Sequence, residues 1–92
     1  MSMTRKELLD AAKQIVTQDR NAQHGEPEDT FGLIAAYWSA HLDHPVSSAD
    51  VSVMMTLLKL ALLKTNPTNI DNWLDGCGYL ACGAEIATEK TA

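Results

Sequence analysis

Two aspartates and a tyrosine follow one another at four-residue intervals near the end of the sequence, as Asp71, Asp75 and Tyr79. In a helix, residues spaced by four lie on one face, so the two carboxylates would be neighbours. Mg²⁺ takes oxygen ligands and commonly uses one or two protein carboxylates together with substrate phosphates. The pattern therefore favours a Mg²⁺ site at Asp71 and Asp75. Alternatively, the acids complement the positive end of a helix, which accounts for Asp71 better than for Asp75 because the effect fades after the first turn.

Basic side chains that could contact a phosphate occur in two other places. Lys59 interrupts an apolar stretch, where a charge is costly to bury without a partner. It either faces an acidic cluster or a phosphate, or extends its ammonium group to solvent. Arg20 and His24 lie in a polar connection, in which arginine could bind phosphate and histidine could stack on a base or act as an acid, unless both are simply solvated. The acidic residues of positions 26–29 would add metal ligands if they faced the two aspartates.

Four helical segments are expected to position these groups, and almost no strand pattern is present. Apolar residues recur at three- and four-residue spacing from Thr4 to about Gln18, from about Pro27 to Leu42, from Ser47 or Ser48 to about Lys64, and from Thr68 or Asn69 to near Thr88. Thr4 with Glu7 matches a capping box, a hydroxyl N-cap followed three residues later by a glutamate. The connection between the first two segments is longer than most links between helices, which favours a functional loop.

The last two segments carry the main predictions about packing. In the third, apolar residues occupy nearly every side, so one face should meet the rest of the domain and another a second subunit. In the fourth, the expected core face consists of Ile70, Trp73, Leu74, Cys77, Leu80, Ala81 and Ala84. Its glycines allow another helix to approach closely, or mark a break near Gly76–Gly78. We expect an all-α bundle of about four helices, one domain over residues 1–92 with an ordered core of about 4–88, that forms a homodimer or homotetramer.

The composition excludes several classes of protein. A net charge of −5 on 92 residues, with a pI of about 4.9, disfavours direct binding of DNA or RNA, which requires clustered lysine and arginine. The most apolar stretch, residues 51–63, is shorter than the roughly 18 residues that a membrane span needs. Two cysteines alone, Cys77 and Cys82, complete neither a zinc ligand set nor a disulfide framework. We therefore expect a cytoplasmic protein that does not bind membranes.

Taken in order, these residues resemble a family of small phage and prophage proteins, a domain of unknown function. The shared set runs through Asp19-Arg20, His24-Gly25, Pro27, Phe31, Trp38, Asp50-Val51, Met54-Met55, Lys59, Asn66-Pro67, Asp71-Asn72-Trp73, Asp75 and Gly78-Tyr79. The resemblance covers about residues 8–86. It implies a location in the host cytoplasm if the protein is encoded by a phage.

The segment from Asp71 to Tyr79 also looks like the last metal-binding helix of MazG-like all-α nucleoside-triphosphate pyrophosphatases and of phage nucleotide-modification-associated proteins. In those families acidic pairs on two helices hold Mg²⁺ in a dimer or tetramer. By this likeness Asp75 matches the terminal aspartate and Asp71 the acid one turn before it. The first acidic pair has no counterpart, because residues 51–64 contain no acid and carry Lys59 instead. The metal motif is therefore degenerate.

The likeness implies a Mg²⁺-dependent protein that hydrolyses a (deoxy)nucleoside triphosphate, or binds one without cleaving it. Asp71 and Asp75 would hold the metal, Arg20 and Lys59 would contact phosphates, and His24 or Tyr79 would contact sugar or base. Two alternatives remain. The chain could be a non-enzymatic, acidic phage accessory protein that binds a host protein, since its net charge suits a basic partner. It could also be a structural oligomer in which Lys59, Asp71 and Asp75 form a buried ion-pair network.

Overall fold

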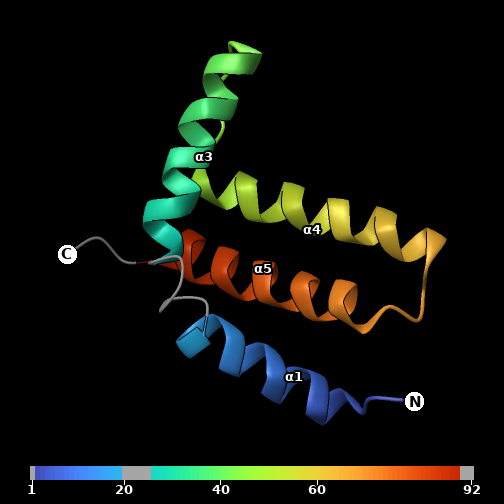
Figure 1. The fold of residues 1–92 in the computed structure, drawn as a ribbon. Coiled ribbons are helices and arrows are strands. Elements are labelled where there is room, and N and C mark those ends of the chain that lie inside the picture. The colour runs from blue at the N-terminus through green and yellow to red at the C-terminus, as the bar shows by residue number, and fades with distance from the viewer. Residues whose placement is uncertain (1, 20–25, 90–92) are drawn as a thin grey trace.

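The structure, a computed structural model, describes residues 2–19 and 26–89, and its regular elements in this part of the chain are all helices. Its elements are α1 (Arg5–Gln14), a single π-helical segment η1 (Ile15–Asp19), α3 (Pro27–Leu42), α4 (Ser48–Thr65) and α5 (Ile70–Thr88) (Figure 1). No strand occurs in residues 2–19 or 26–89. The predicted all-α class with four α-helices is confirmed.

Side-chain caps explain why two of the helices begin where they do. The Thr4 hydroxyl accepts a hydrogen bond from the Glu7 amide, and the Glu7 carboxylate accepts one from the Thr4 amide. Ser47 and Asp50 form the same reciprocal pair at the start of α4. Hydrogen bonds from the backbone and the side chain of Thr4 lower the pKa of Glu7 below its ordinary value. Those from Ser47 lower the pKa of Asp50 in the same way.

The first helix changes its geometry in its last turn. The sequence predicts a helix to about Gln18, whereas the α-helix ends at Gln14 and a π-helical turn continues to Asp19. The Thr17 hydroxyl donates to the Lys13 carbonyl at 2.5 Å, and a threonine bonded in this way competes with the backbone amide for the same acceptor.

The connection between α3 and α4 is short and closed by one hydroxyl. Asp43 ends α3 in the left-handed conformation, with φ 52° and ψ 45°. The Ser39 hydroxyl accepts from the Val46 amide at 2.8 Å and donates to the Val46 carbonyl at 3.2 Å. These bonds turn the chain back so that α4 begins beside the first half of α3, where the Ser48 Oγ lies 3.8 Å from the position of a Cβ on Gly32.

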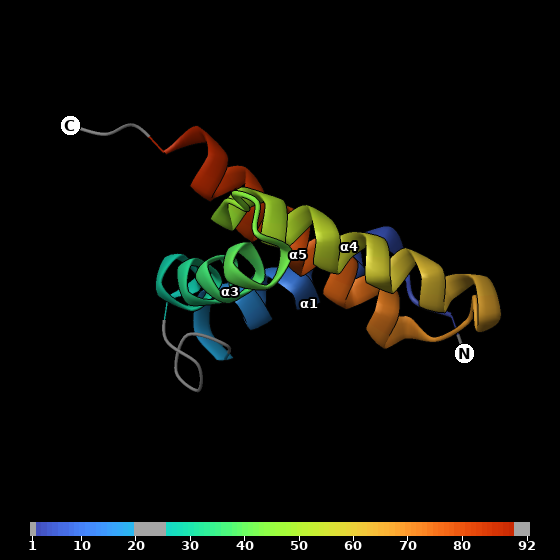
Figure 2. The same ribbon diagram turned by 90° about the horizontal axis from the view of Figure 1, so that it is seen from above.

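Helix α5 lies at the centre of the arrangement. Helix α4 runs antiparallel along one of its sides, and α1 with η1 runs along another (Figure 1). Helix α3 crosses one end of the α4–α5 pair steeply, on the same side as α1, and its second half projects away from the other helices (Figures 1 and 2). The main core lies at this crossing, around the buried side chains of Phe31, Ala35, Val51 and Cys82.

Small side chains bring α4 and α5 into close contact. Gly83 is buried against Ser52, so that a Cβ on the glycine would lie 2.6 Å from the Ser52 Cβ. A Cβ on Gly78 would lie 3.2 Å from a methyl carbon of Val16 in η1. Close approach of neighbouring helices, predicted from the glycines, is confirmed at these two positions. The alternative, a break near Gly76–Gly78, is wrong, because α5 is continuous.

The expected core face of α5 is wrong for its largest members. Trp73 and Leu80 are exposed, as are Ala81 and Ala84, and the other three predicted members are only partly buried. The buried residues of α5 are instead Asn72, Cys82 and Gly83. The reason is the close contact at Gly83, which turns the small side chains of α5 toward α4 and leaves the large ones at its margin. On α4, Val53, Met54, Leu57, Leu58, Leu60 and Leu62 are exposed as well. None of the described helices combines the length and apolarity needed to cross a bilayer.

Candidate functional site

An ion pair joins the middle of α4 to the first half of α5. The Lys59 Nζ lies 3.1 Å from the Asp75 Oδ2, and the two side chains are 19% and 42% exposed. The lysine that interrupts the apolar stretch therefore has an acidic partner and is mostly buried, while the carboxylate remains open to solvent. Removing either partner would leave the other charge partly buried and uncompensated.

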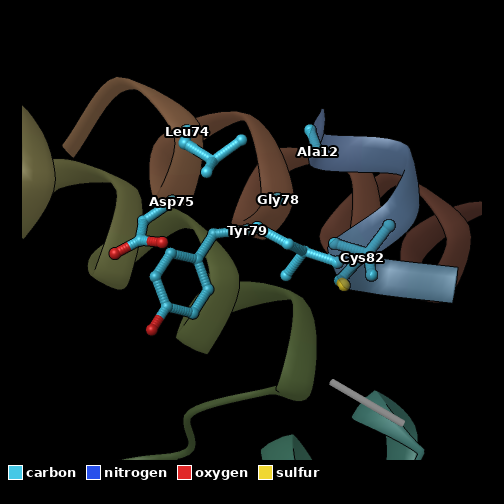
Figure 3. A pocket seen from close by; sticks show the side chains of 8 residues that line it. Ala12, Leu74, Asp75, Gly78, Tyr79 and Cys82 are labelled. Carbon is cyan, nitrogen blue, oxygen red and sulfur yellow. The ribbon is translucent and has the colours of Figure 1, made fainter. Parts of the chain in front are cut away.

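A small hollow adjoins this ion pair on the side of α1. It is lined by Asp75 and Tyr79, together with Leu74, Gly78 and Cys82 of α5 and Ala12, Ile15 and Val16 of α1 and η1. Asp75 and Tyr79 project from α5 next to each other (Figure 3). The volume of about 20 Å³ holds about one water molecule. A nucleotide would therefore have to bind at the rim, with only a small group entering the hollow.

Tyr79 links the hollow to the main core. Its ring contacts that of Phe31 from α3, with centroids 6.2 Å apart and planes inclined by 36°. A tilted pair at this distance is a favourable arrangement of aromatic rings. The contact holds the tyrosine ring beside Asp75, so the position of one candidate ligand depends on the packing of α3.

Asp71 lies one turn before Asp75 on the same uninterrupted helix. It is exposed and is the acidic residue of the first turn of α5. The continuous helix supports the expectation that Asp71, Asp75 and Tyr79 share one face. The described residues contain no group of three or more histidine, cysteine, aspartate or glutamate side chains that could hold a metal ion. The acids of positions 26–29 thus do not join the two aspartates, and side-chain oxygens for a cation would come from α5.

Two of the predicted ligand-binding residues cannot be placed. Arg20 and His24 lie outside the described residues, in the connection between η1 and α3. Their roles stay predictions. Among the residues that the structure does bring together, Gly78 and Leu74 went unrecognised as part of the site. Leu74, Gly78 and Cys82 follow one another at four-residue intervals, which would have been the signal, because this spacing places all three on one face of the helix. That face meets α1.

Comparison with known proteins gives a family and two phage relatives. Residues 7–87 match a family described as a domain of unknown function, DUF6378. The chain is 32% identical over 82 residues to the Gene 55 protein of Mycobacterium phage D29, covering 89% of this chain and 54% of that protein. It is also 32% identical over 73 residues to the Gene 55 protein of Mycobacterium phage L5, covering 78% and 47%. The chain thus spans about half the length of these relatives, and no solved structure matches it.

Proposed function

The chain belongs to the DUF6378 family of domains of unknown function, and we propose that it binds a nucleoside triphosphate together with Mg²⁺. The observation that supports this function best is the Lys59–Asp75 pair, in which a lysine lies 3.1 Å from a half-exposed carboxylate that lines a hollow. A lysine ammonium has three donors, so Lys59 can hold Asp75 and still donate to a phosphate oxygen.

In this proposal Asp71 and Asp75 are the protein ligands of the cation. Mg²⁺ is commonly bound through one or two carboxylates plus substrate phosphates, which suits two acids on one helix. Bound there, the ion would neutralise part of the phosphate charge. Tyr79 or His24 would contact the sugar or base, and Arg20 would contact a phosphate. Two acids on a single helix favour binding over hydrolysis, because the second acidic pair of the MazG-like families has no counterpart.

Isothermal titration calorimetry tests the proposal. Each of the four deoxynucleoside triphosphates is titrated into the folded chain with and without Mg²⁺, and the solution is then assayed for released phosphate or pyrophosphate. We expect binding that requires Mg²⁺ and is weakened at least about tenfold, or about 1.4 kcal/mol, in Asp75→Asn and in Lys59→Met. The exposed Lys6–Asp10 pair of α1 offers the matched control, since Asp10→Asn removes an ion pair far from the hollow. A folded wild type that gives no heat with any nucleotide refutes the proposal.

A structural role for the same ion pair is the second candidate, favoured by the largely buried lysine that bridges two helices. A double variant, Lys59→Met with Asp75→Leu, separates the two. Replacing both partners by apolar side chains is often neutral or stabilising, whereas removing one is destabilising. If the pair is only structural, the double variant keeps its stability and the wild type binds no nucleotide. If the pair serves a ligand, the double variant keeps its stability but loses the Mg²⁺-dependent binding.

A further inference from the structure

The single chain leaves an unusually large surface uncovered, and many large apolar side chains are exposed on it. Its accessible surface is 6660 Å², whereas a compact monomer of 10.0 kDa is expected to have roughly 5200 Å². Its radius of gyration is 14.1 Å, against about 12 Å for a compact domain of this length. The difference in area exceeds the roughly 800 Å² that each partner contributes to an interface of standard size. A second molecule could therefore cover as much surface as a stable dimer requires.

A trough along the seam of α4 and α5 concentrates this apolar surface. Two hollows of about 270 and 170 Å³ follow the seam and meet at Leu80, which lines both. Val53 and Leu60 of α4 border the trough on one side, and Leu80 and Trp73 of α5 border it on the other. These four side chains are each about half exposed. The α5 residues involved are not those that line the hollow beside α1, so the trough and that hollow lie on different sides of the helix.

The trough has both the projections and the depressions that a self-complementary surface needs. Leu60 and Leu80 are exposed, while Gly76, which lines the same hollow, offers open space, because a Cβ built on this glycine meets no atom within 4 Å. A two-fold axis brings the same patch of both subunits together, so the leucine of one copy can lie over the glycine of the other. The lining carries a single charged side chain, Lys59, which is paired with Asp75. Depletion of charge is typical of the interface core in homodimers and disfavours a nucleic acid or a strongly charged protein as the occupant.

We propose that a second copy of this chain occupies the α4–α5 trough, so that two α4–α5 pairs pack face to face in a two-fold symmetric dimer. The hollow beside α1 lies outside the contact and stays open in the dimer. This inference shares Lys59 with the proposed function and rests otherwise on different residues, so the two can fail separately.

Sedimentation or light scattering of the full chain over a hundredfold range of concentration tests the dimer. The wild type should have twice the 10.0 kDa mass of one chain. Gly76→Trp places a large side chain in the trough at a position where the single chain has space, so it should keep its helical circular dichroism and raise the dissociation constant at least about 100-fold. Leu80→Gln should also raise the dissociation constant of the dimer.

Leu58→Gln is the matched control, because Leu58 is as exposed as the trough leucines but lines neither hollow. This variant should remain dimeric. A wild type that stays monomeric at every concentration overturns the proposal. The proposal is also overturned if Leu58→Gln dissociates the dimer while Gly76→Trp leaves it intact. The contact would then use another face of α4.

Discussion

Replacing Gly83 by alanine should destabilise the protein, although alanine is the better helix former. Gly83 lies inside α5, where alanine gains up to about 1 kcal/mol over glycine. The new Cβ would, however, lie 2.6 Å from the Cβ of Ser52 and 3.0 Å from its Oγ. The Ser52 Cβ is attached directly to the backbone of α4, so rotating a side chain cannot relieve the contact.

The expected loss follows from these distances. Carbon atoms in favourable contact are about 3.5–4.0 Å apart, so α4 and α5 would have to separate locally by about 1 Å. Overpacking of this kind costs typically about 1–3 kcal/mol, which outweighs the gain in helix propensity. We expect a net loss of about 1–2 kcal/mol, equivalent to a fall in Tm of roughly 5–15 °C for a domain of this size.

Urea unfolding followed by circular dichroism, at one protein concentration for all variants, measures the effect. Gly32→Ala is the control, because its Cβ would meet only the Ser48 Oγ, at an ordinary 3.8 Å, and should add about 0.5–1 kcal/mol. Ser52→Gly removes the side chain of α4 that the new methyl group of Gly83→Ala would meet. The double variant should therefore recover part of the stability lost in Gly83→Ala. If Gly83→Ala is as stable as Gly32→Ala, the close contact between α4 and α5 is refuted.

The same unfolding assay checks four further expectations. Ser47→Ala removes the cap of α4 and should lower the free energy of unfolding by about 0.5–2 kcal/mol. An unchanged free energy of unfolding would mean that the cap does not form in solution. Hydrogen bonds from the Ser47 backbone and side chain lower the pKa of Asp50, so its contribution to stability exists above the unfolded pKa and disappears as the pH falls through the folded one. The advantage of wild type over Asp50→Asn should therefore shrink between about pH 5 and pH 2, and a constant difference would contradict this. Ser52→Ala should be neutral or stabilising, because the buried hydroxyl has no hydrogen-bond partner, and a clear loss would reveal one. Trp73→Phe removes the 2.8 Å bond from the indole to the Pro67 carbonyl and should cost about 0.5 kcal/mol or slightly more.

Helix boundaries could be predicted from the sequence because local chemistry sets them. Ser47 and Thr4 cap helices where their hydroxyls suggested, and Pro27 occupies the first position of α3. Helix α3 ends at Leu42 and α4 at Thr65, within a residue of the expected ends. Each of these signals acts over three or four residues and needs no knowledge of the fold.

Packing between helices could be predicted only in part, since it depends on residues far apart in the chain. The glycines of α5 indicated close approach, yet nothing in the sequence singled out Ser52 as the partner of Gly83. Large apolar side chains such as Trp73 and Leu80 were assigned to the core because hydrophobicity alone does not say which neighbour covers them. For the candidate site, the shared face of Asp71 and Asp75 follows from spacing, whereas the ion pair of Asp75 with Lys59 requires the antiparallel pairing of α4 and α5.

The central place of α5 also affects how the chain can be made. Helix α1 and η1 contact α5, although α5 begins only at Ile70. During synthesis the amino-terminal segment therefore leaves the ribosome long before its packing surface exists, and the apolar side chains of Ile15 and Val16 stay without that cover until translation has passed the last helix. A nascent chain interrupted before Ile70 would lack the surface against which both α1 and α4 pack.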